Sequence, residues 1–75
     1  MIIAEQSFAG PDHSRQNAIC FVEHNTLDYL VRTIGLITFY YDIDTYVYCD
    51  DLLEAMFVFR DACNKITKMG LHKEG

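Results

Sequence analysis

One amphipathic stretch near the C-terminal end constrains the fold of this chain more than any other part of the sequence. It begins at Asp50 and Asp51, which are good N-cap residues for a helix. Apolar residues follow at alternating spacings of four and three, the period of an α-helix: Leu52, Met56, Phe59, Cys63 and Ile66. Gly70 stands where a left-handed residue would end such a helix. The pattern predicts a long helix over residues 51–68 with one buried face.

The length and composition predict one small globular domain over residues 1–75. Hydrophobic residues make up 51% of the 75 residues, with five Tyr and five Phe, which is far from a disordered composition. A domain of this size buries only about 60% of the surface that its unfolded chain exposes. Its core is therefore marginal, and such domains often gain stability by self-association.

The first half of the chain predicts two strands and a short helix. Residues 2–8 alternate imperfectly, as a strand would, and residues 18–22 form a short apolar run bounded by polar residues. The segment between them, residues 10–17, has turn-forming residues and no apolar side chain. After a capping pair at Asn25-Thr26, four apolar residues at helical spacing predict a helix near residues 26–34: Leu27, Leu30, Val31 and Ile34.

The middle of the chain predicts a hairpin. Residues 36–41 and 46–49 are rich in β-branched and aromatic residues, and Asp42–Thr45 between them has turn chemistry. A hairpin closing there pairs Tyr41 with Tyr46 and Phe39 with Tyr48. The alternative is one long bent strand over residues 36–48.

The predicted order is ββαββα, an α+β fold. A four-stranded antiparallel sheet in the order 1-2-4-3, with both helices on one face, closes this order without strain. The expected topology resembles the ferredoxin-like α/β sandwich with its last strand moved to the front. The resemblance is one of topology alone and implies no functional residues.

Two helices cover only one face of such a sheet, so the other face is a candidate partner-binding surface. The expected hairpin places five apolar and aromatic residues on it: Ile37, Phe39, Tyr41, Tyr46 and Tyr48. A second copy or another protein would cover this face, and the chain's own ends and long loop are the alternative cover. A third reading is base stacking, as on the sheet of the RNA-recognition motif.

The long helix offers a second candidate surface. Phe57 falls opposite the apolar stripe, and Leu53 lies one turn before it. Two exposed apolar residues side by side can form a small hot spot for a protein partner. The alternative is scattered surface hydrophobicity, which is common.

The charge distribution favours a basic protein partner. The formal net charge is −5, and residues 1–59 carry nine acids against two arginines. Because nucleic acids bind by phosphate neutralisation, this balance disfavours direct DNA binding. Asp42 and Asp44 lie at the centre of the acidic part, and they are expected to contact a basic partner surface.

No pattern in the sequence points to catalysis, a metal or another cofactor. The cysteines at positions 20, 49 and 63 lack C-x-x-C spacing and sit in apolar contexts, so we expect reduced, buried thiols in a cytoplasmic protein. No segment is apolar and long enough to span a membrane.

The sequence therefore favours a small acidic protein–protein interaction module, expected to be a homodimer and not an enzyme. Its most specific form is an inhibitor that occupies a basic, nucleic-acid-binding surface of another protein. In size, acidity and lack of chemistry the chain resembles small phage proteins that block CRISPR or restriction machinery. The alternative is an RNA- or small-ligand-binding sheet domain.

Overall fold

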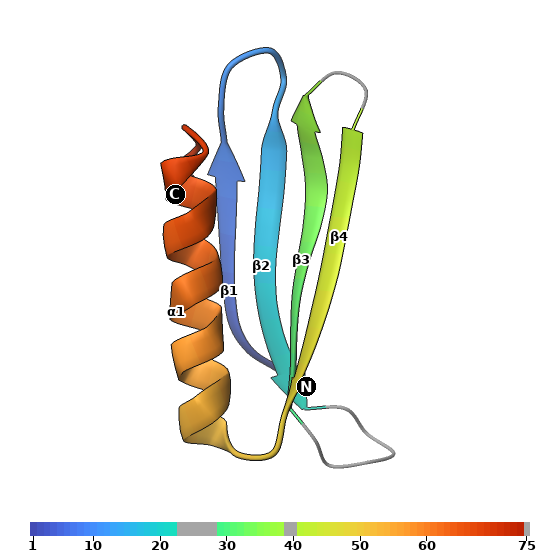
Figure 1. Cartoon of the computed structure of the whole chain (residues 1–75), viewed down its shortest axis with the longest axis vertical. Helices are drawn as coiled ribbons and strands as arrows, with labels where there is room; N and C mark the ends of the chain where they lie inside the picture. The colour runs from blue at the N-terminus through green and yellow to red at the C-terminus, as the bar shows by residue number, and fades with distance from the viewer. Residues whose placement is uncertain (23–28, 39–40, 75) are drawn as a thin grey trace.

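The computed structural model describes residues 1–22, 29–38 and 41–74. Within them the elements follow the order β1 (Ile2–Ala9), β2 (Arg15–Val22), β3 (Tyr29–Thr38), β4 (Tyr41–Cys49), α1 (Leu52–Lys68) and β5 (His72–Lys73). The strands form one antiparallel sheet, and α1 packs on one face of it (Figure 1). The α+β class is confirmed, but the expected four strands and two helices are replaced by five strands and, in the described residues, one helix.

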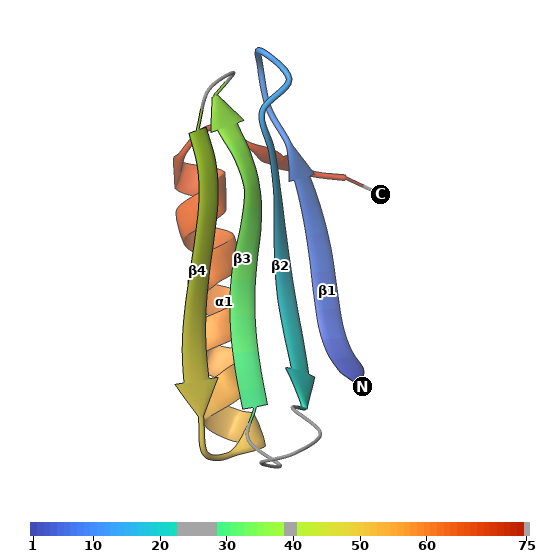
Figure 2. The same cartoon turned by 90° about the vertical axis from the view of Figure 1, so that its right-hand side faces the viewer.

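The sheet is a simple meander with a short fifth strand added at one edge. Its order is β4-β3-β2-β1-β5, so each of the first four strands pairs with its neighbour in sequence (Figure 2). The expected 1-2-4-3 order is therefore wrong, and so is the likeness to a permuted ferredoxin-like sandwich. The error follows from the missing first helix: without a crossover, the third strand returns directly beside the second.

The helix expected near residues 26–34 is wrong, because β3 begins at Tyr29; residues 26–28 lie outside the described part. The spacing of the leucines and branched residues fits a helix, but a helix of about nine residues is marginal alone. The same segment can form eight consecutive pairs with β2, from Val22–Tyr29 to Arg15–Leu36. Its β-branched residues suit that pleated environment, so tertiary pairing outweighs the local pattern.

The predicted hairpin exists, but its turn was placed too late in the chain. β3 runs to Thr38 and β4 starts at Tyr41, so Asp42–Thr45 is part of a strand. Tyr46 pairs with Arg32 rather than Tyr41. Asp42 and Asp44 are two residues apart, which suits one face of a strand as well as a turn, and edge strands accept charged residues.

The first hairpin is confirmed, with a shorter loop than expected. β2 begins at Arg15, so the loop has only five residues, 10–14. Asp12 and His13 have φ values of 57° and 62°, the sign pattern of a type I′ turn, and the Ser14 amide donates to the Pro11 carbonyl at 3.0 Å. Asp tolerates this left-handed region better than most residues.

Helix α1 is confirmed at both ends. The Glu54 amide donates to the Asp51 carboxylate at 2.8 Å, so Asp51 is the N-cap. Gly70 follows the C-cap residue Met69 with φ +94°, where a side chain would be strained. Asp61 and Lys65, four residues apart on the helix, form an ion pair at 3.0 Å.

The core lies between α1 and the facing side of the sheet. Two clusters of buried residues fill it: Phe8, Ala18, Cys63, Ile66 and Leu71 in one, and Cys20, Val31, Cys49 and Ala55 in the other. The three cysteines are buried, as expected. The predicted stripe is correct at Cys63 and Ile66, but Leu52 is 46% exposed and Ala55 is fully buried. The helix therefore approaches the sheet through a small residue in its first turns.

Candidate binding surfaces of the sheet and helix

The face of the sheet away from α1 is covered by no other element of the described residues. Figure 2 views the sheet from this side, with α1 behind it. Thr45 and Val47 of β4 face the helix side, so Tyr46 and Tyr48 face the open side. They are 51% and 59% exposed. We call this surface the open face.

An apolar row crosses the open face near one end of the strands. Cross-strand pairing aligns four residues of this row: Ile2, Phe21, Leu30 and Tyr48. Leu30 is only 4% exposed although α1 lies on the opposite side. Its cross-strand neighbours in the row are Phe21 and Tyr48. The row is therefore a compact apolar patch whose two ends, Ile2 and Tyr48, remain open to solvent.

The next row mixes charge with apolar side chains. It aligns Glu5, Ile19, Arg32 and Tyr46 across the first four strands. The Arg32 guanidinium lies over the Tyr46 ring, 4.9 Å from its centre, which is cation–π distance. This contact holds the Tyr46 ring beside the apolar row and adds a positive group to the edge of the patch.

The predicted sheet-face residues are only partly brought together. Tyr46 and Tyr48 share the open face, as expected. Ile37, Tyr41, Asp42 and Asp44 fall on the strands β3 and β4, but their side chains lie outside the described part. Phe39 lies outside the described residues altogether. The predicted surface also omitted Phe21 and Leu30, because the first was assigned to a buried strand and the second to a helix.

The predicted pair on the helix is exposed, as expected from its position on the helical wheel. Leu53 and Phe57 are 69% and 64% exposed and line a shallow hollow with Met56 and Arg60. The hollow is small, about 120 Å³. It offers a contact point on α1, on the opposite side of the molecule from the open face.

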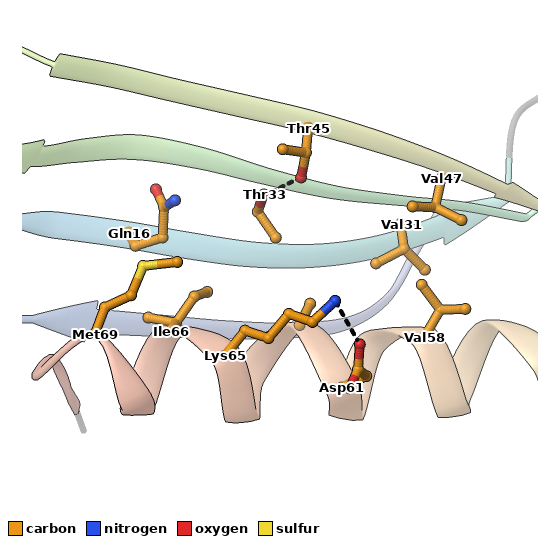
Figure 3. Close-up of a pocket in the computed structure, with 11 residues that line it drawn as sticks. Gln16, Val31, Thr33, Thr45, Val47, Val58, Asp61, Lys65, Ile66 and Met69 are labelled. Carbon is orange, nitrogen blue, oxygen red and sulfur yellow. Dashed lines mark hydrogen bonds and ion pairs between the residues drawn. The ribbon is translucent and has the colours of Figure 1, made fainter.

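A groove that the sequence did not predict lies between α1 and the β2–β4 part of the sheet. Its volume is about 280 Å³ (Figure 3). Most of its lining is apolar: Val31, Val47, Val58, Ala62, Ile66 and Met69. Val47 faces the helix side yet is 44% exposed, because α1 does not close over the edge strand β4. The groove therefore opens beside this edge.

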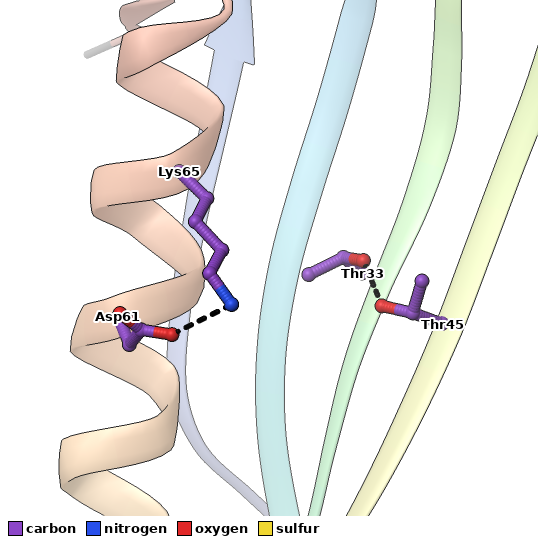
Figure 4. A network of polar contacts seen from close by, with 4 residues as sticks. All are labelled: Thr33, Thr45, Asp61 and Lys65. Atoms are coloured by element: carbon purple, nitrogen blue, oxygen red, sulfur yellow. Dashed lines mark hydrogen bonds and ion pairs between the residues drawn. The ribbon is translucent and has the colours of Figure 1, made fainter.

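The polar groups of the groove are few. The hydroxyls of Thr33 and Thr45 bond to each other across β3 and β4, while Asp61 and Lys65 pair on the helix side (Figure 4). Because the ion pair is neutral overall, the groove has no net charge from these residues. Gln16 completes the lining from β2.

Gln16 is a buried polar residue with an unpartnered atom. It is 2% exposed, and no group among the described residues donates a hydrogen bond to its Oε1. A buried acceptor without a partner costs about 1–3 kcal/mol of stability. In the sequence, Gln16 is a polar residue two positions before the apolar run of residues 18–22, and its turn-forming neighbours place it in the expected loop of residues 10–17.

The titratable groups of the described residues do not form a catalytic set. Burial raises the pKa of the Cys20, Cys49 and Cys63 thiols above their ordinary value of 9.0, with Glu54 adding to the effect at Cys49. Buried thiols of raised pKa are poor nucleophiles at neutral pH. No cluster of His, Cys, Asp or Glu in the described ranges could hold a metal ion. Across those same ranges, no helix has the length and apolarity needed to cross a membrane.

Comparisons with protein-family models, with curated protein sequences and with solved structures find no match to this chain. Its function is therefore argued from the surfaces described above.

Proposed function

We propose that this protein is a small acidic protein–protein interaction module that acts by binding and not by catalysis. The observation that carries the proposal is the apolar row across the open face, from Ile2 to Tyr48. Antiparallel sheets with one solvated face normally show polar residues there. A contiguous apolar and aromatic patch on such a face is typical of an interface.

The occupant that we propose for the open face is a second copy of the chain. A standard interface buries about 800 Å² on each partner. The accessible surface is 5302 Å², so such an interface needs roughly a seventh of it. One side of a four-stranded sheet can supply that share. A homodimer would also add to a core that is marginal for a chain of 75 residues.

The outer surface of the homodimer would then bind a basic partner. The net charge is −5 for each copy, which steers positively charged proteins and repels nucleic acids. An inhibitor that occupies a nucleic-acid-binding surface is the most specific form of this proposal. Asp42 and Asp44 on the edge strand β4 are the acids we propose for that contact.

Dimerisation is tested by comparing Tyr48→Ala with Phe57→Ala. Both changes remove an exposed aromatic ring, but only Tyr48 lies on the open face. We expect Tyr48→Ala to raise the dimer dissociation constant about tenfold or more, as loss of an aromatic anchor does. Phe57→Ala should leave it unchanged. Equal effects of the two changes, measured by sedimentation velocity, would exclude the open face as the dimer interface.

Binding to a basic partner is tested by removing or reversing the charges of Asp42 and Asp44 and by raising the salt concentration. A protein retained from a cell lysate by the wild-type chain should bind less tightly to a double variant, Asp42→Asn with Asp44→Asn. It should bind least tightly to the double reversal to Lys. Its association rate should fall as salt rises, because exposed charges are screened beyond about 8 Å at physiological ionic strength. A complex insensitive to both changes would contradict the acidic-surface proposal.

A further inference from the structure

The groove between α1 and the β2–β4 part of the sheet has an unexplained feature at its inner end. The Gln16 side chain is buried, and within the part of the chain that the structure describes its Oε1 has no hydrogen-bond partner. Buried polar atoms in folded proteins are almost always satisfied, and an exception is a sign of a missing partner or a function. Gln16 is one of the residues that line the groove, whose volume is about 280 Å³, and its Oε1 is buried beneath the groove surface.

The groove has the character of a small-ligand site. Such sites are mostly apolar and contain a few polar groups that fix the orientation of the ligand. Here valines, an alanine and an isoleucine form the walls, and Gln16 supplies an acceptor. The neutral Asp61–Lys65 pair and the Thr33–Thr45 pair leave no unbalanced charge.

We propose that the groove binds a small, neutral, largely apolar molecule whose single hydrogen-bond donor is accepted by Gln16 Oε1. An apolar cavity of about 150 Å³ holds benzene. The larger volume here suits a fused bicyclic aromatic, such as an indole, with its N–H directed at the amide oxygen. An ionised ligand is disfavoured because the walls cannot compensate the desolvation of its charge.

Met69 is the residue that controls access to Gln16. It is 53% exposed, and Figure 3 shows its side chain beside the Gln16 side chain. A methionine has three rotatable bonds and adapts readily to a neighbouring group. We infer that rotation of this side chain opens a path from the groove to the amide. The ligand thus enters beside the β4 edge and ends against β2.

The test uses two isosteric probes, indole and benzofuran. They have nearly the same shape, but only indole has an N–H donor. We expect both to shift the methyl NMR signals of Val31, Val47 and Ile66, and indole to bind about 3- to 10-fold more tightly. That ratio corresponds to the net value of one hydrogen bond. Equal affinities in the wild type, or no shift with either probe, would overturn the proposal.

The Gln16→Met variant provides the second readout. Methionine has a similar volume and no orphan acceptor, so the variant should melt at a higher temperature than the wild type. It should also bind indole and benzofuran equally. A lower melting temperature would show that the amide is satisfied in solution, for example by an ordered water, and would contradict the proposal. Retained preference for indole would also contradict it.

Discussion

At the residue scale, the best-defined local interaction is the cap at the start of α1. The Asp51 carboxylate accepts from the Glu54 amide, while the adjacent Asp50 is exposed and does not cap. These two aspartates form a matched pair, since they have the same charge and nearly the same distance from the helix N-terminus. The difference between them isolates the hydrogen bond from the helix-dipole effect.

We therefore expect Asp51→Ala to lower the free energy of unfolding by about 1 kcal/mol. For a domain of this size the melting temperature should fall by about 4–8 °C. Asp50→Ala should cost only a few tenths of a kcal/mol. Urea unfolding followed by circular dichroism measures both. Equal losses in the two variants would mean that charge, and not the cap, stabilises the helix.

The buried thiols predict how stability depends on pH. Because burial raises their pKa, the folded state keeps these protons at a pH where the unfolded chain loses them. Their contribution is complete below the ordinary thiol pKa of 9.0 and is lost as pH rises above it. Each thiol changes the free energy of unfolding by at most about 1.4 kcal/mol per pH unit.

We expect the melting temperature to fall between about pH 8 and pH 10, and Cys20→Ala to make that slope shallower. The slope is the readout, because the small cavity left by the substitution lowers stability equally at every pH. The Ser7→Ala variant, which changes a half-buried residue without an ionisable side chain, is a control that should keep the wild-type slope. An unchanged slope for Cys20→Ala would show that this thiol is not shielded from solvent.

At the element scale, the register of β3 against β4 could not be predicted from the sequence. The acidic pair Asp42 and Asp44 looks like a turn when only local chemistry is considered. Its spacing of two residues fits an edge strand equally well, and only the pairing with β3 distinguishes the two. The spacing of Leu30, Val31 and Ile34 likewise fits a helix, although these residues lie in the strand β3. By contrast, α1 could be predicted because its cap, its stripe and its terminal glycine all agree.

A double-mutant cycle tests this register. Arg32 lies over the Tyr46 ring, so Arg32→Met and Tyr46→Leu should be coupled by about 0.5–1 kcal/mol in unfolding free energy. Arg15 pairs with Leu36 instead, so a cycle between Arg15→Met and Tyr46→Leu should show no coupling. Absence of coupling in the first cycle would contradict the observed register.

At the scale of the whole molecule, the binding surfaces depend on topology more than on sequence pattern. An uncovered sheet face was predictable, because a chain with few helices cannot cover both sides of a sheet. The residues on that face were not predictable, because Phe21 and Leu30 lie beside Tyr48 only when β2, β3 and β4 pair in sequence order. The groove could not be predicted from the sequence either, because it forms where α1 leaves the edge strand β4 uncovered.

The central claim is that the open face is buried against a second copy. Sedimentation equilibrium of the wild-type chain over a range of concentrations tests it most directly. The account predicts a reversible dimer, with a melting temperature that rises with protein concentration because subunit binding adds to apparent stability. A single 8.7 kDa species that persists at high micromolar concentration would contradict the claim.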